Sequence, residues 1–165
     1  MLRFFVAAFI SILMVLAPAQ ADERGFFNDI KGKWAGSGEI VAGKFKGTRF
    51  TCSFDGDLPD AVMGMSIDGN CRVGVFNQKM SADVRKRSGR YRGAFLDGAK
   101  GEGLDITGGR YLASKRAFVM DLKRKQLRGV MRAQLRGADK MNISISVLVN
   151  KDYVPVIGLN LKRRS

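Results

Sequence analysis

Three carboxylates in one glycine-rich stretch are the residues whose types and spacing could support catalysis or metal binding. Asp97, Glu102 and Asp105 lie in the segment FLDGAKGEGLDITGG, residues 95–109. A glycan hydrolase could use Asp97 with Glu102 or Asp105 as its two catalytic carboxyl groups, and carboxylates are also ligands for calcium. The segment matches a calcium loop poorly, because such loops space their oxygen ligands more densely and Lys100 lies within it. A turn with solvated charges is the simpler interpretation.

Histidine is absent from the chain. Its absence removes serine–histidine–aspartate triads, cysteine–histidine pairs and histidine metal sites, together with the commonest acid/base side chain. We therefore expect no catalytic residue, no metal site and no cofactor.

Basic residues dominate the charge, and the formal net charge is +14 at neutral pH. A turn at Ser88 and Gly89 places five cations around one hairpin tip, where phosphates or sulfates could bind with release of counterions. A charged edge that discourages aggregation is the alternative. Specific nucleic-acid binding is not expected, because no recognisable module interleaves aromatics with these cations. The expected partners are anionic lipid, lipopolysaccharide or acidic polysaccharide, and the candidate anion-binding residues are Arg85, Lys86, Arg87, Arg90, Arg92, Arg128 and Arg132.

The N-terminal segment predicts export. Arg3 is followed by an apolar run from Phe4 to Ala17 and by the small-x-small triplet Ala19–Gln20–Ala21, which is the plan of a cleavable signal peptide. The run has fourteen residues, fewer than the about 20 of a spanning helix. We expect cleavage after residue 21, export by the general secretory route, and a single periplasmic or secreted domain, residues 22–165, that does not span the membrane.

Cys52 and Cys71 are the two cysteines of the chain. An even number of cysteines in an oxidising compartment predicts a disulfide, and two cysteines without histidine make a poor zinc site. Closing this loop of nineteen residues stabilises the fold by about 3 kcal/mol on the chain-entropy model.

Alternating apolar residues and glycine-rich turns predict strands after Gly32. The pattern is clearest over 141–149, and the chain resumes as a strand over 156–162, so the two form a terminal hairpin. Two-residue turns are predicted at Asp68–Gly69, Ser88–Gly89 and Ala42–Gly43. The segment 122–136 fits a strand or a helix, and its interior Gly129 favours the strand.

These elements predict an all-β fold of about nine or ten strands, mostly antiparallel in sequence order, preceded by a short helical lead-in over 22–31. An up-and-down β-barrel and a closely related sandwich both fit. Gly32, Lys33 and Trp34 resemble the G-x-W start of the first strand in lipocalin-like and other calycin barrels, and the pattern is similar to that of small exported bacterial proteins. The resemblance implies that Trp34 closes one end of a barrel, that Gly32 and Trp34 are structural, and that the other end forms a cup for a small apolar ligand.

The leading functional hypothesis is an exported, non-enzymatic, envelope-associated or ligand-binding barrel that engages an anionic amphiphile or glycan through its interior or its basic rim. An envelope enzyme acting on glycans through Asp97 with Glu102 or Asp105 is the second hypothesis. A protein that docks a partner through an exposed apolar face is the third. The ligand, the interior cavity and the oligomeric state are left open by the sequence.

Overall fold

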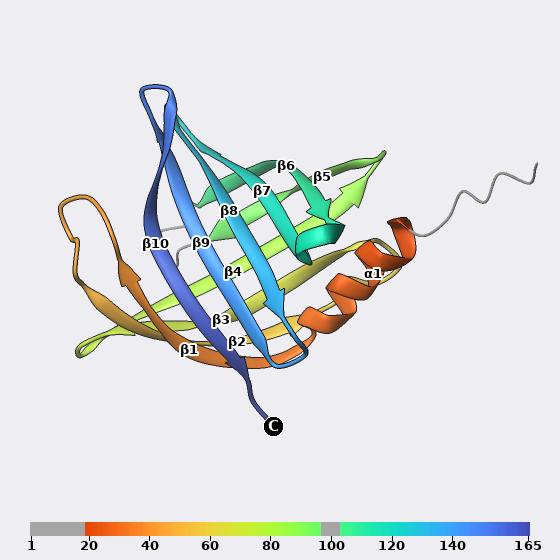
Figure 1. The fold of residues 1–165 in the computed structure, drawn as a ribbon, viewed down its shortest axis with the longest axis horizontal. Helices are drawn as coiled ribbons and strands as arrows, with labels where there is room; N and C mark the ends of the chain where they lie inside the picture. Colours follow the sequence, from red (N-terminus) through yellow and green to blue (C-terminus); the bar gives the residue numbers. More distant parts are fainter. Residues whose placement is uncertain (1–18, 97–102) are drawn as a thin grey trace, which may run out of the picture.

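The computed structural model describes residues 19–96 and 103–165, which form a closed antiparallel β-barrel (Figure 1). Ten strands follow one another around the barrel in sequence order, and the last pairs with the first. Of the two architectures that the sequence predicts, a barrel and a sandwich, this order confirms the up-and-down barrel, with a helical lead-in before it. The elements are α1 (Ala19–Ile30), β1 (Gly32–Ile40), β2 (Arg49–Asp57), β3 (Gly64–Val73), β4 (Phe76–Arg87), β5 (Arg90–Leu96), β6 (Leu104–Leu112), the 3-10 turn η1 (Ala113–Lys115), β7 (Ala117–Arg124), β8 (Leu127–Arg136), β9 (Lys140–Val149) and β10 (Asp152–Arg163).

Helix α1 covers one end of the barrel, at the lower right in Figure 1. Phe26, Phe27 and Ile30 are each at most 2% exposed, and the ring of Phe27 packs edge-on against that of Phe118 with centroids 5.1 Å apart. The aromatics of the lead-in therefore pack on the barrel. We call this the closed end. The open end is defined by the described turns at the opposite ends of the strands: β1–β2, β3–β4, β7–β8 and β9–β10.

Strand alternation places the apolar residues inside the barrel. Along β9, Met141 is buried and Ile143 and Ile145 pack against the core, whereas the outward positions hold Asn142 and Ser144. The predicted terminal hairpin is confirmed by the pairing of β9 with β10. Ser88 and Gly89 form the predicted two-residue turn, both with positive φ.

The predicted turn at Asp68–Gly69 is wrong, because both residues lie inside β3 and pair with β2 and β4. The turn is instead at Gly74–Val75, where Gly74 has a φ of 56°. Gly69 serves a close approach: a Cβ there would lie 2.7 Å from the Phe54 ring. A glycine in a strand often marks such an approach.

Two other connections differ from the sequence prediction. One is longer than the predicted two-residue turn, and the other lies inside a segment that was predicted as a single element. Ala42 and Gly43 lie in a connection that spans residues 41–48. The segment 122–136 is extended, as expected, but it contains the end of β7, a turn at Lys125–Gln126 and β8. Lys125 has a φ of 53° although it is neither glycine nor asparagine. The turn at Lys125–Gln126 therefore contains none of the residues that usually mark turns.

Candidate functional site

An apolar cavity of about 240 Å³ occupies the barrel interior. Nine of the strands and α1 contribute to its wall. Gln78 and Ser81 are the two polar side chains among the described residues that line it. Ile30 and Trp34 form its floor at the closed end, whereas Val73 and Gln78 are exposed and line it near the β3–β4 turn. The cavity therefore opens at the end opposite α1.

Five methionine side chains contribute to the cavity wall. Met65, Met80, Met120, Met131 and Met141 all line it, whereas Met63 packs against the core without lining the cavity. Methionine is flexible and polarizable, so a wall rich in it can adapt to apolar ligands of different shape.

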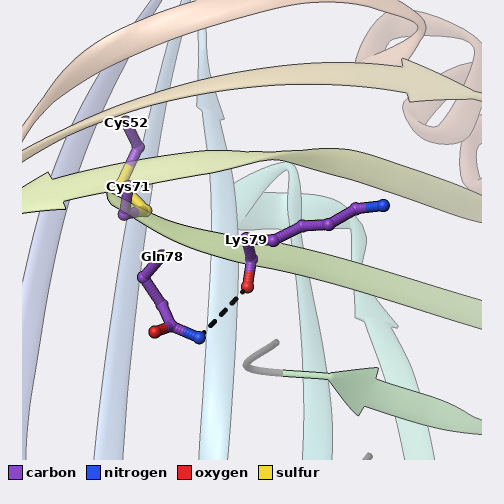
Figure 2. The surroundings of a disulfide bond; sticks show 4 residues. All are labelled: Cys52, Cys71, Gln78 and Lys79. Atoms are coloured by element: carbon purple, nitrogen blue, oxygen red, sulfur yellow. Dashed lines mark hydrogen bonds between the residues drawn. A yellow bond between two sulfur atoms is a disulfide. The ribbon is translucent and has the colours of Figure 1, made fainter. Parts of the chain in front are cut away.

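The predicted disulfide joins Cys52 on β2 to Cys71 on β3. The two residues are direct partners in the strand register, and their Cα atoms are 4.1 Å apart, within the about 7 Å that a disulfide can span. Both cysteines line the cavity. Figure 2 shows the disulfide beside Gln78, the register partner of Cys71, whose amide donates a hydrogen bond to the carbonyl oxygen of Lys79. The disulfide thus covalently joins two strands of the cavity wall.

Trp34 and Arg163 connect the floor of the cavity to α1. The indole Nε1 of Trp34 donates a 2.7 Å hydrogen bond to the carbonyl oxygen of Ile30, the last residue of the helix. The guanidinium of Arg163 lies 4.3 Å from the centre of the Trp34 ring and donates to the carbonyl oxygens of Asp29 and Lys31. Helix C-termini leave carbonyl groups without intrahelical partners, and these two side chains satisfy two of them.

Gly32 lies beside this contact. Its φ of 108° is unfavourable for other residues, and a Cβ would lie 3.1 Å from the Arg163 Nη1 atom. Gly32 therefore lets the chain turn from α1 into β1 next to the arginine.

A buried carboxylate also holds α1 on the barrel. Glu23 is 8% exposed and accepts hydrogen bonds from Lys86 Nζ at 2.7 Å and from the Tyr91 hydroxyl at 2.8 Å. Burial, followed by the hydrogen bond to Glu23, raises the pKa of Tyr91 well above its usual range. No local sequence pattern indicates this network, since Glu23 and Tyr91 are 68 residues apart.

The candidate anion-binding residues are distributed over both ends of the barrel. The β4–β5 hairpin is at the closed end, away from the cavity mouth. Within it, Lys86 pairs with Glu23, Arg85 with Asp83 at 2.9 Å, and Arg92 with the carbonyl oxygens of Tyr91 and Thr107.

For the other four candidate residues, no side-chain ion pair or hydrogen bond within the fold is described. Arg87 and Arg90 face each other in the register at the hairpin tip. Arg128 lies at the open end, just after the β7–β8 turn. Arg132 is partly buried further along β8, and its Nε atom is buried without a hydrogen-bond partner among the described residues. Anion binding by any of them stays a prediction.

Of the candidate carboxylates, Asp97 and Glu102 lie outside the described residues. Asp105 is exposed on β6. In the described part of the chain, no three cysteine or acidic side chains gather in a way that could hold a metal ion. Residues 1–18 of the predicted signal peptide, residues 1–21, likewise lie outside the described range. None of the helices within the described range is long and apolar enough to cross a membrane.

No protein-family model and no curated protein matches this sequence. Among solved structures, the chain is similar to the S-type phycobiliprotein lyase CPES from Guillardia theta, with a TM-score of 0.56 and 12% identity over 88% of this chain and 96% of the other. It is also matched to a DUF3598-family protein of unknown function from Nostoc punctiforme, with a TM-score of 0.48 and 12% identity over 84% of this chain and 49% of the other. The first similarity supports a lipocalin-like barrel fold, while the G-x-W motif gains no support from a sequence family.

Proposed function

We propose that this protein is an exported, non-enzymatic, envelope-associated barrel that binds the apolar part of an anionic amphiphile in its interior. The observation that carries the proposal is the apolar cavity of about 240 Å³. A smaller apolar cavity, of about 150 Å³, is sufficient to bind benzene in another protein. A small ring, or the inner part of an alkyl chain whose remainder extends through the open mouth, therefore fits the space and the chemistry of this wall.

The cavity lining favours binding over catalysis. Ser81 and Gln78 are its polar side chains among the described residues, and the sequence has no histidine that could activate a serine. The solved neighbour is named a lyase, but at 12% identity the likeness supports the fold and not the activity.

Laurate, an anionic amphiphile with a twelve-carbon chain, tests the proposal when added to the purified protein below its micelle concentration. In protein labelled with ¹³C at its methionine methyl groups, we expect NMR shifts at the five cavity methionines and none at Met63, which is outside the cavity. Dodecyltrimethylammonium, with the same chain and a positive head group, should bind more weakly.

A variant that fills the cavity provides the matched test. Ala133 lines the cavity, so Ala133→Leu should weaken laurate binding at least tenfold. Ala35 follows the inward Trp34 on β1 and faces outward, so Ala35→Leu should bind as the parent does. Absence of methionine shifts, or equal binding by Ala133→Leu and the parent, would contradict the proposal.

A further inference from the structure

Large apolar side chains are exposed almost entirely at one end of the barrel. Nine such residues are exposed in the described part of the chain, and Val62, in the β2–β3 connection, is the one at the closed end. The other eight lie in or beside the four described turns of the open end: Val41, Phe45, Val73, Val75, Phe76, Leu127, Val149 and Tyr153. Val75 is 91% exposed, Phe76 77% and Phe45 63%. These side chains contribute little to the core, so the folding of the barrel does not explain them.

The same turns are strongly basic. The segments 41–49, 72–79 and 123–128 contain no acidic residue, and Asp152 is the single acid of the β9–β10 turn. The cations of the four turns are Lys44, Lys46, Arg49, Arg72, Lys79, Lys123, Arg124, Lys125, Arg128 and Lys151. Glu39, at the end of β1, lies 3.9 Å from Arg49 and offsets part of this charge. We call these exposed apolar residues and cations together the open rim.

The composition of the open rim fits the surface of an anionic bilayer. Apolar side chains at the turn tips can enter the boundary between head groups and acyl chains, while lysine and arginine beside them are attracted to anionic head groups. Lys44 illustrates the arrangement, since its ammonium lies 5.7 Å from the centre of the neighbouring Phe45 ring. Turns from different parts of the barrel, seen along the left side of Figure 1, carry this pairing of apolar and basic residues.

We propose that the open rim docks on the surface of an anionic phospholipid bilayer, with Phe45, Val75 and Phe76 entering the interface and the surrounding cations contacting head groups. The docked orientation turns the mouth of the cavity toward the lipid. Docking itself does not depend on the proposed ligand binding, although together the two give an amphiphile a route from the membrane into the barrel.

Flotation of the mature chain, residues 22–165, with phospholipid vesicles tests the docking. We expect binding to vesicles of phosphatidylglycerol mixed with phosphatidylcholine, and binding at least tenfold weaker to pure phosphatidylcholine. The double variant V75S/F76S should bind the anionic vesicles at least tenfold more weakly than the parent. Val62→Ser, at the closed end, should bind as the parent does.

A second pair of variants tests the charge with equal changes at the two ends. Lys44→Gln with Lys46→Gln removes two cations from the open rim, and we expect roughly tenfold weaker binding. Arg136→Gln with Lys140→Gln removes two exposed cations from the β8–β9 turn at the closed end and should have little effect. Equal losses at the two ends, or equal binding to neutral and anionic vesicles, would overturn the proposal.

The two proposals fail separately. If the parent binds laurate but no variant or vesicle composition changes flotation, the docking is wrong and the ligand binding stands. If Ala133→Leu and the parent both float with the anionic vesicles and neither binds laurate, the ligand binding is wrong and the docking stands.

Discussion

At the scale of single residues, Glu23 is the charged group that the fold buries most completely among the described residues. A buried carboxylate is costly unless it is paired and hydrogen-bonded. Here Lys86 supplies the opposite charge and Tyr91 a second donor, and the ammonium also lies 5.2 Å from the centre of the Tyr91 ring. The three side chains therefore attach the start of α1 to β4 and β5.

Tyr91→Phe should reveal the contribution of this network through its pH dependence. The variant keeps the ring but leaves Glu23 with one donor fewer, and we expect the free energy of unfolding at pH 7 to fall by about 1–3 kcal/mol. Because folding raises the pKa of Tyr91, its stabilising effect is complete below the unfolded value of about 10 and is lost as the pH rises above it.

Urea unfolding between pH 7 and pH 11 measures both effects. The parent should lose stability above about pH 10, and the Tyr91→Phe variant should lose less over the same interval. Tyr153→Phe, at an exposed position, is the control and should change stability by less than about 0.5 kcal/mol. Parallel pH profiles for Tyr91→Phe and the parent would show that the hydroxyl has no such role.

At the scale of elements, the disulfide between Cys52 and Cys71 cross-links β2 to β3. The C52A/C71A double variant should lower the free energy of unfolding by about 3 kcal/mol, as expected for a loop of nineteen residues. Alanine keeps the cavity wall apolar. The loss of stability therefore reports removal of the cross-link and not a change in the polarity of the wall.

Denaturant midpoints with and without a thiol reductant measure this contribution. Reduction should destabilise the parent by a similar amount and leave the double variant unaffected. If the double variant is as stable as the oxidised parent, the cross-link does not contribute to stability as the chain-entropy model expects.

The same scale shows what sequence patterns can predict here. Strict alternation identified β9, because a period of two has a single interpretation there. Glycine was ambiguous, because it marks a turn at Ser88–Gly89 but a close contact at Gly69. The turn at Lys125 was missed for the opposite reason, since lysine rarely adopts a positive φ.

The cavity was predictable only as an implication of the barrel resemblance. Which residues line it depends on how strands far apart in the sequence curve around the interior, and no local pattern records that curvature. The methionines could have been noticed as a flexible apolar set, and the exposed turn valines and phenylalanines break the usual polar composition of turns. The cysteine pair was predicted from compartment and number alone and is confirmed.

At the scale of the whole molecule, the two ends of the barrel differ in construction. The open end carries exposed apolar and basic side chains, whereas the closed end joins the beginning and the end of the described chain. β1 pairs with β10, and Arg163 contacts α1, Trp34 and the β8–β9 connection, where its Nε donates to the carbonyl oxygen of Ala138 at 3.1 Å. One side chain near the C-terminus thus helps to hold the helix over the cavity floor.

Arg163→Lys should therefore destabilise the closed end although it preserves the charge. Lysine lacks the planar fork that donates to several carbonyl groups at once and stacks on an aromatic ring, so we expect the free energy of unfolding to fall by roughly 2 kcal/mol. Arg164→Lys is the matched control, because the bond described for that residue comes from its backbone N–H to Lys33. Trp34 is the single tryptophan of the chain, so its fluorescence reports unfolding from the contact itself. Its emission in the folded state should change in Arg163→Lys and remain constant in Arg164→Lys.

Equal unfolding midpoints and unchanged emission in Arg163→Lys and Arg164→Lys would mean that pairing of β1 with β10 closes the barrel without help from Arg163.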